Sequence, residues 1–334
     1  MAYTTIDNPE LHFQIKLYAG NSSTQSITLD GSEDMQPDWV VIKNRGTTNN
    51  WRIADSVRSA DNSLMTNLNN EASDLANTIT SFNSNGFSLG ANASYVNDIN
   101  ATSNNYVAFC WKESATAGFD ILTHTGTGSA HTVSHNLSAK PHTIFHKGVS
   151  HDHQWMVQHH SIGATMSLVL SSTAAQDDSA TQWNDTEPTS SVFTVGTNGQ
   201  VNTASSTYVA YLFTSIQGFS KMGSYIGNGN VNGTYVHLGF NPAFVWIKEA
   251  TATSGWILHN DKMNDNINPM QNFLQPNETG TESDNANLAV DFLSNGFKVR
   301  NDKGDTNTSG NTMVFWAFAE QPFVNSKGVP CNAR

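Results

Sequence analysis

The histidines of this chain are concentrated in one stretch, where two of them have a spacing that suits metal binding. Nine of the twelve histidines lie between His124 and His160. His151-Asp152-His153 is an H-x-H pair, and alternate residues of an extended strand place both rings on one face, where they can bind a metal ion. Three copies around a threefold axis would supply six imidazoles. We favour a polar surface loop whose imidazoles meet water. A pH-sensitive patch is a third interpretation, because His titrates near pH ~6.5.

Two acidic loops are candidate calcium sites. Asp302, Asp305 and Asn307 lie in a Gly-containing loop, and Asp261 and Asp265 lie close in sequence. Oxygen-rich loops of this kind can bind Ca²⁺. Neither follows the spacing of an EF-hand, and Asp and Asn in loops commonly serve turns. We therefore predict no metal and no cofactor, and leave open whether the first of these loops or the histidine pair binds a metal.

Signatures of common enzymes are missing from the sequence. It contains no G-x-S-x-G, H-E-x-x-H or Walker motif. Two carboxylates could form a glycosidase pair. The acidic residues cluster in turn-rich stretches, however, such as Asp177-Asp178 and Glu282-Ser283-Asp284. We therefore predict that the chain is not an enzyme and has no catalytic residues.

Tryptophans are candidate platforms for stacking sugars. Trp51, Trp155 and Trp256 recur at one landmark of an internal repeat, and a residue present in every copy is typical of a core. Trp183 has no counterpart in the other copies. We therefore interpret Trp183 as the better candidate for an exposed contact.

Composition excludes several classes of partner. The chain of 334 residues has 16 Lys and Arg against 28 Asp and Glu, a net charge of −12. Nucleic-acid binding depends on neutralising phosphates with Lys and Arg, so we expect no nucleic-acid partner. No run of 18 apolar residues is present, so we expect no membrane insertion. The N-terminus lacks a secretory signal and Cys110 and Cys331 are expected to be free thiols, which indicates folding in a reducing cytoplasm.

The elements that would position these residues are repeated three times. Each copy has an aromatic residue or His before a Gly, a Pro that leads a strand ending in Lys, a Trp 14 residues after that Pro, and an aromatic closing strand. The Pro-led strands are residues 37–43, 141–147 and 242–248. Their Pro landmarks are 104 and 101 residues apart, so the unit has about 100 residues, the size of a small β domain.

Short runs of β-branched and aromatic residues between Gly, Asn, Ser and Thr predict an all-β fold. The spacing of the landmarks predicts three tandem antiparallel β-sandwich modules, such as jelly rolls. We place them at residues 1–115, 116–217 and 218–323, with a C-terminal tail at 324–334.

The Pro-led and closing strands are apolar at nearly every position, whereas a strand with one solvated face alternates. We therefore expect both faces to be covered, the second by a neighbouring copy or by another subunit. The second copy is an exception, because Thr143 and His146 dilute its strand and predict a wetter outer face. Large exposed apolar patches mark interfaces, so we also expect an oligomer or an assembly.

Several longer stretches resemble a family of repetitive structural proteins encoded by tailed bacteriophages. The stretches that carry the resemblance are PDWVVIKNRGTTNNWRIADSVR, SFNSNGFSLG, YVAFCWK, NPAFVWIK and FLSNGFKVR. The opening residues around Tyr18 and the closing residues 322–334 are also similar to this family, so the resemblance spans essentially the whole chain. The main departure is KGVSHDHQW, which stands in the second copy where the first has KNRGTTNNW.

The resemblance implies a non-enzymatic virion protein, most often described as a tail fibre or tail protein, and some tail proteins of this kind have concanavalin-like sandwich domains. It implies assembly in the host cytoplasm, contacts with other virion proteins and with copies of itself, and attachment to a glycan or receptor of the host surface. It supplies no catalytic or binding residues. A capsid-surface decoration protein and a tail-borne polysaccharide depolymerase stay open as alternatives.

Overall fold

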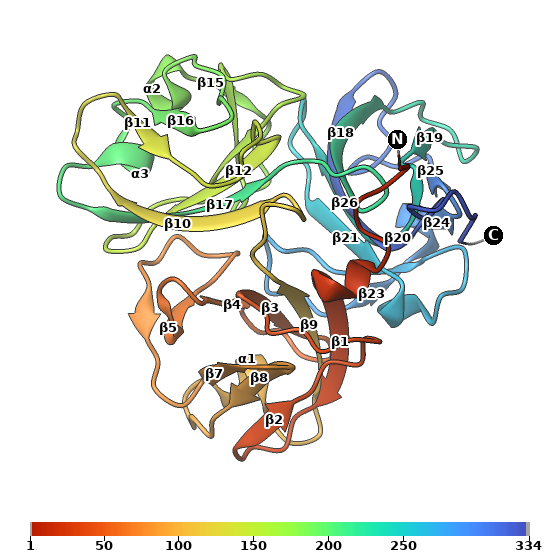
Figure 1. Cartoon of the computed structure of the whole chain (residues 1–334), viewed down its shortest axis with the longest axis horizontal. Helices are drawn as coiled ribbons and strands as arrows, with labels where there is room; N and C mark the ends of the chain where they lie inside the picture. The colour runs from red at the N-terminus through yellow and green to blue at the C-terminus, as the bar shows by residue number, and fades with distance from the viewer. Residues whose placement is uncertain (1, 332–334) are drawn as a thin grey trace.

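The computed structural model describes residues 2–331 and is all-β, as predicted. Strands make up 41% of it and helices 6%. Figure 1 shows three lobes, coloured red to brown, yellow to green and cyan to blue, which meet at the centre of the molecule. We refer to residues 2–115, 116–217 and 218–323 as segments 1, 2 and 3. Met1 and residues 332–334, the end of the expected tail, lie outside the described residues.

Each segment contains one larger antiparallel sheet in which the closing strand lies between the first strand and the Pro-led strand. In segment 1 the order is β1 (Phe13–Ala19), β9 (Asn105–Trp111), β3 (Trp39–Asn44), β4 (Arg52–Asp55), β5 (Ser59–Leu64) and β6 (Ser73–Asp74). In segment 2 it is β10 (Phe119–Thr125), β17 (Thr207–Phe213), β12 (Thr143–Gly148), β13 (Met156–His159), β14 (Met166–Val169) and β15 (Asp177–Asp178). In segment 3 it is β18 (Ser220–Ile226), β26 (Thr312–Pro322), β20 (Phe240–Glu249) and β21 (Trp256–Asn260).

Each segment also has a smaller antiparallel sheet. These sheets are β2 (Gln25–Ile27), β8 (Gly86–Leu89) and β7 (Ile79–Asn83); β11 (His131–Ser134) and β16 (Val192–Val195); and β19 (Tyr235–His237), β25 (Gly296–Val299) and β24 (Val290–Leu293). The remaining strands pair as β22 (Asn272–Phe273) and β23 (Ser283–Asp284). The helices are single turns, namely α1 (Val96–Ile99), α2 (Ala180–Trp183), α3 (Gly199–Asn202), η1 (Pro9–Leu11), η2 (Lys262–Asn264) and η3 (Ala286–Leu288).

Within each segment, the larger and smaller sheets enclose an apolar cluster of their own. In segment 1, Val40 and Ile42 of β3 and Ala108 of β9 pack with Phe87 and Leu89 of the smaller sheet. The corresponding clusters of segments 2 and 3 are built in the same way. Because successive side chains of a strand point to opposite faces, the alternate residues of these strands face away from this cluster.

Those alternate residues form one large core that all three segments share. It includes Trp39, Phe109 and Trp111 from segment 1, Phe145, Tyr211 and Phe213 from segment 2, and Phe244, Trp246, Trp316 and Phe318 from segment 3. Ring contacts across the boundaries are Trp39 with Tyr211 (centroids 4.7 Å apart), Phe145 with Trp246 (5.4 Å) and Trp111 with Phe244 (5.8 Å). The double cover expected for these strands is thus confirmed, and the neighbouring segments supply it. Because the neighbouring segments cover these strands, the apolar faces no longer argue for an oligomer, and self-association stays a prediction.

The wetter outer face expected for segment 2 is wrong. Thr143 is 1% exposed and its hydroxyl donates to the carbonyl of Gln158. His146 is fully buried, with its ring 6.0 Å from that of Trp183. Both residues are polar, yet both are enclosed by the fold. A polar group that is hydrogen-bonded or neutral can be buried at moderate cost, so polarity alone did not indicate exposure.

The repeated tryptophans occupy corresponding places in the shared core. Trp51, Trp155 and Trp256 are each fully buried at or next to the start of the strand that follows the Pro-led strand. The ring of Trp256 lies 5.5 Å from those of Trp246 and Trp316. The interpretation of these residues as core is therefore confirmed.

We expect Trp256→Ala to lower the free energy of unfolding by ~3–5 kcal/mol, because it leaves a cavity in a packed aromatic core. Urea unfolding followed by circular dichroism measures the change, and Trp155→Ala serves as the matched substitution in segment 2. A loss under ~1 kcal/mol at Trp256 would contradict its place in the core.

Candidate functional site

The contacts between segments, which we call seams, hold several fully buried polar groups. Each repeated tryptophan donates its indole N–H to backbone carbonyls of another segment. These bonds run from Trp51 to Gln275 (3.1 Å) and Glu278 (3.1 Å), from Trp155 to Met65 (2.8 Å), and from Trp256 to Val169 (3.2 Å) and Ser172 (3.0 Å). The direction is the same at every seam: segment 1 donates to segment 3, segment 2 to segment 1, and segment 3 to segment 2.

Three buried lysines follow the same cyclic pattern. Lys43, Lys147 and Lys248 end the Pro-led strands and are fully buried. Each ammonium donates to a carbonyl across the seam, which belongs to Thr279 (2.9 Å), Asn69 (2.9 Å) or Thr173 (3.4 Å) respectively. Burial lowers the pKa of Lys43 to about 8, of Lys147 to about 7 and of Lys248 to about 8. A buried amine is tolerable here because carbonyl oxygens accept hydrogen bonds from its N–H groups.

The loop between each Lys and the following Trp lies on a seam. The carbonyls of Arg45, Val149 and Ala250, two residues after each Lys, accept backbone N–H bonds from Glu282 (2.9 Å), Ala72 (2.9 Å) and Gln176 (2.7 Å). Both ends of the loop are therefore anchored to another segment. This anchoring explains why the Pro-to-Trp distance is constant while the loop sequence changes.

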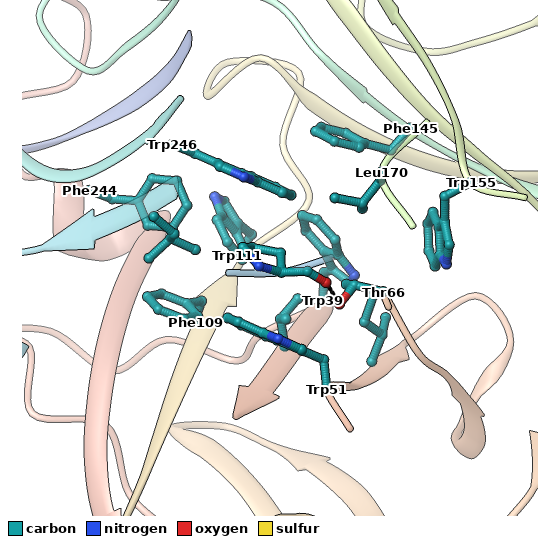
Figure 2. Close-up of a pocket in the computed structure, with 14 residues that line it drawn as sticks. Trp39, Trp51, Thr66, Phe109, Trp111, Phe145, Trp155, Leu170, Phe244 and Trp246 are labelled. Carbon is teal, nitrogen blue, oxygen red and sulfur yellow. Dashed lines mark hydrogen bonds between the residues drawn. The ribbon is translucent and has the colours of Figure 1, made fainter. Parts of the chain in front are cut away.

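The centre of the shared core encloses a small apolar cavity, shown in Figure 2. Its volume is about 20 Å³, which is enough for one water molecule and too small for an organic ligand. The indole N–H groups of Trp39, Trp111 and Trp246, which line it, have no acceptor among the described residues. The hydroxyl of Thr66 donates to the carbonyl of Pro276 at 2.6 Å. The cavity is a packing defect of an aromatic centre.

A cluster of imidazoles lies between the two sheets of segment 2, where the rings of His124 and His146 also contact Phe193. The Nε2 atoms of His124 and His146 are 2.8 Å apart, so one ring donates and the other accepts. Both rings stack on Tyr208, with centroids 5.3 and 5.0 Å away. Burial lowers the pKa of His124 to about 4 and holds that of His146 well below its usual value. The pair is therefore neutral at pH 7.

The same two positions have different residues in the other segments. His124 corresponds to Tyr18 and Tyr225, and His146 corresponds to Ile42 and Ile247. The hydroxyls of Tyr18 and Tyr225 donate to the carbonyls of Ile99 (2.7 Å) and Thr306 (2.5 Å). Segment 2 thus replaces a tyrosine-to-backbone bond by an imidazole pair.

The loop of His151 and His153, for which metal binding was left open, adjoins this cluster. The rings of His151 and His153 are stacked with centroids 5.2 Å apart, and His153 also stacks on Tyr208. The Nε2 of His151 bonds to the hydroxyl of Ser206. Within residues 2–331, no three His, Cys, Asp or Glu side chains converge as a metal site of that kind requires.

The acidic loop of segment 3 is held by the protein itself. One carboxylate oxygen of Asp305 accepts from the hydroxyl of Ser254 (2.6 Å) and from the amide of Gly255 (2.9 Å). Asp302 forms an ion pair with Lys303 at 2.9 Å. Asn307 donates to the carbonyl of Asn301 at 2.6 Å. Asp305 and Asn307 thus serve turns, the interpretation that the sequence favoured.

Other residues singled out from the sequence are dispersed. Trp183, the better candidate among the tryptophans for an exposed contact, is fully buried: it packs in the cluster between the two sheets of segment 2. Asp177 and Asp178 form the short exposed strand β15. Glu282 pairs with Arg45 across the seam between segments 3 and 1.

The cysteine prediction holds over the described part of the chain, where both thiols are free. Cys110 is buried in the cluster of segment 1, and burial raises the pKa of its thiol. Cys331 is partly exposed next to the bridge between Val324 and Pro330, which turns the end of the chain back on itself.

Residues 8–322 match the model of a family described as a domain of unknown function, DUF7483. The chain belongs to this family. No curated protein matches it. The family description states no activity, so it neither supports nor opposes the resemblance to phage proteins. Across residues 2–331, the helices of this DUF7483 member are all too short or too polar to span a membrane.

Sequence reasoning missed several buried polar groups of this DUF7483 protein. The strand-ending lysines were visible as landmarks, yet nothing in the sequence indicates that their amines lie inside the molecule. The pairing of His124 with His146 was equally hidden. A signal existed for the pair, because both positions depart from the residues of the other two copies at once.

We expect acid to destabilise the wild type through the imidazole pair. The folded-state pKa of His124 lies below the unfolded value of ~6.5, so the unfolded chain takes up protons first as pH falls. Stability from the neutral pair is present above pH ~6.5 and is lost below it. Both imidazoles of the unfolded chain take up protons in this range while the folded pair stays neutral. Between pH 7 and pH 5, the free energy of unfolding should therefore fall by about 4 kcal/mol more in the wild type than in His124→Tyr with His146→Ile.

That double variant is the matched control, because it installs the residue types of segments 1 and 3. Urea titrations at both pH values give the difference between the proteins, so carboxylates that titrate in the same range cancel. Equal pH dependence in the two proteins would contradict the role of the pair.

Proposed function

We propose that this protein is a non-enzymatic structural protein of a bacteriophage virion, a tail fibre or tail-associated component that takes part in assembly and host attachment. The resemblance to repetitive phage proteins supports this role. A particle component assembled in the host cytoplasm also suits a chain whose described thiols are free.

We propose further that the chain consists of three tandem β-sandwich modules, at residues 1–115, 116–217 and 218–323, followed by the tail at 324–334. The matching order of the larger sheets supports this division. So do the corresponding places of Trp51, Trp155 and Trp256 and the constant direction of their bonds across the seams.

The observation that carries the proposed function is the closed ring of seams. Identical head-to-tail contacts close into a ring when the rotation between units adds up to a full turn. Here the tryptophan and lysine bonds of each segment point to the next around the ring, and a single aromatic core lies at its centre. Because the three lobes share this core, separating one lobe from the others would expose aromatic surface. Such a body suits a mechanical and adhesive part of a particle.

Several charged side chains that could serve in catalysis form structural hydrogen bonds or ion pairs instead. The buried amines donate to carbonyls, Asp305 holds a turn, and Arg45 pairs with Glu282. These uses favour a structural role over the depolymerase that remains the second alternative.

Location and copy number in purified particles test the proposal. We expect antibodies against the protein to label the tail of the phage that encodes it, and quantitative mass spectrometry to find a few to tens of copies per particle. Hundreds of copies on the shell would favour the decoration protein. Complete absence from particles would overturn a virion role. Release of reducing ends from host capsular polysaccharide would favour the depolymerase.

The histidine loop provides a test of host attachment. We expect His151→Ala with His153→Ala to keep the fold at a cost of about 1–2 kcal/mol, because the bond to Ser206 and the stacking on Tyr208 are lost, and to slow adsorption of particles to host cells. His237→Ala, an exposed histidine of segment 3, is the matched control. If well-formed particles of the double variant adsorb normally, the loop has no role in host attachment.

A further inference from the structure

The seam between segments 3 and 1 closes the ring without a covalent connection. Segments 1 and 2, and segments 2 and 3, are joined by the chain, whereas the first and last segments meet only through side-chain and backbone contacts. At this seam β1 and η1 lie against β20, β26 and η2, and the ring of Phe13 is 5.7 Å from that of Phe244. Figure 1 shows β1 beside the lobe of segment 3.

A carboxylate without a partner lies at this seam. Asp261 is 1% exposed, and neither of its carboxylate oxygens has a hydrogen-bond partner in residues 2–331. Burial raises its pKa to about 7, and the charge and backbone amide of Lys262 offset only part of that effect. An isolated buried carboxylate is costly, so the position calls for a compensating group.

Further oxygen donors surround the neighbouring carboxylate. The side-chain amides of Asn241 and Asn266 donate to the two oxygens of Glu320, the second at 3.4 Å. The amide oxygens of both asparagines are buried, and no donor for them is found among the described residues. The group therefore presents two carboxylates. The two asparagines turn their amide N–H groups toward Glu320 and keep buried amide oxygens without a donor.

The two carboxylates adjoin a cavity of about 50 Å³ between the two segments, and the two asparagines do not line it. Asp261 and Glu320 line it from segment 3, and Glu10 and Asp30 line it from segment 1. Lys262 also lines the cavity, but it is an exposed side chain. The space admits an ion with one or two waters, and the carboxylates outnumber the cations around it.

The other seams satisfy the corresponding positions in different ways. Ser56 and His160 stand where segment 3 has Asp261, as shown by their shared backbone bond to the residue after the Pro. The Nε2 of His160 is 3.0 Å from the carbonyl of Met222. Glu113 corresponds to Glu320 and bonds to the side chain of Asp120. A carboxylate at Asp261 is thus not required by the repeated architecture.

We propose that the seam between segments 3 and 1 binds a calcium ion, with Asp261 and Glu320 as its charged ligands and the amide oxygens of Asn241 and Asn266 beside them. Calcium takes six to eight oxygen ligands in flexible geometry, and two carboxylates that each bind through both oxygens, together with one or two waters, approach that number. The ion neutralises the buried carboxylate and links the two ends of the ring. The site is independent of any role in a virion.

Calcium-dependent thermal unfolding of the full chain tests the site. After treatment with EDTA and dialysis, we expect added CaCl₂ to raise the midpoint of wild-type unfolding by about 2 °C or more. Isothermal titration calorimetry should give close to one bound calcium ion per chain. Asp261→Asn should unfold in EDTA at the wild-type temperature or above it, because a buried charge is removed, and should bind calcium about tenfold more weakly or not at all.

Two variants serve as matched controls. Asp265→Asn removes an exposed carboxylate four residues away, and Glu113→Gln removes the counterpart of Glu320 at another seam; both should keep the wild-type response. Absence of calcium binding by the wild type would overturn the proposal, and so would an unchanged response of Asp261→Asn. A response to MgCl₂ without a response to CaCl₂ would overturn the assignment to calcium.

Discussion

The structure depends on one constraint: each larger sheet has two apolar faces, and a segment by itself can cover only one. The smaller sheet of each segment covers the first face. The second carries Trp, Phe and Tyr rings that only the other segments can cover. Aromatic side chains bury large areas and accept tilted or edge-on contacts, so three unlike sets of rings can fill one centre. Burial of these second apolar faces therefore holds the three segments together.

Direction is added to this non-directional attraction by the polar groups at the seams. The indole of each repeated tryptophan and the amine of each strand-ending lysine reach carbonyls of another segment. A buried donor without an acceptor is expensive, so these bonds penalise any other arrangement of the segments. The aromatic centre supplies the larger share of the stabilisation, and the lysines and tryptophans define how each segment faces its neighbour.

The departures from threefold repetition are where individual properties arise. Segment 2 has an imidazole pair where the others have a tyrosine and an isoleucine. Segment 3 has a buried carboxylate where the others have a serine and a histidine. The backbone at these positions is shared, so the substitutions change charge and protonation without changing the fold. A repeated architecture thus lets one copy acquire chemistry while the other two maintain stability.

From the sequence alone, the all-β class, the repeated landmarks and the double cover of the strands could be predicted, because strand periodicity and turn residues are local properties. The burial of Trp51, Trp155 and Trp256 followed from their repetition. The wet face expected for Thr143 and His146 was wrong, and Trp183, a candidate for an exposed contact, proved to be buried. Burial depends on what packs against a residue from elsewhere in the chain. The seam bonds of Lys43, Lys147 and Lys248 and the partnerless carboxylate of Asp261 were decided by the tertiary structure. They join residues far apart in sequence, and the free energy of a buried polar group is determined by the neighbours that folding brings to it.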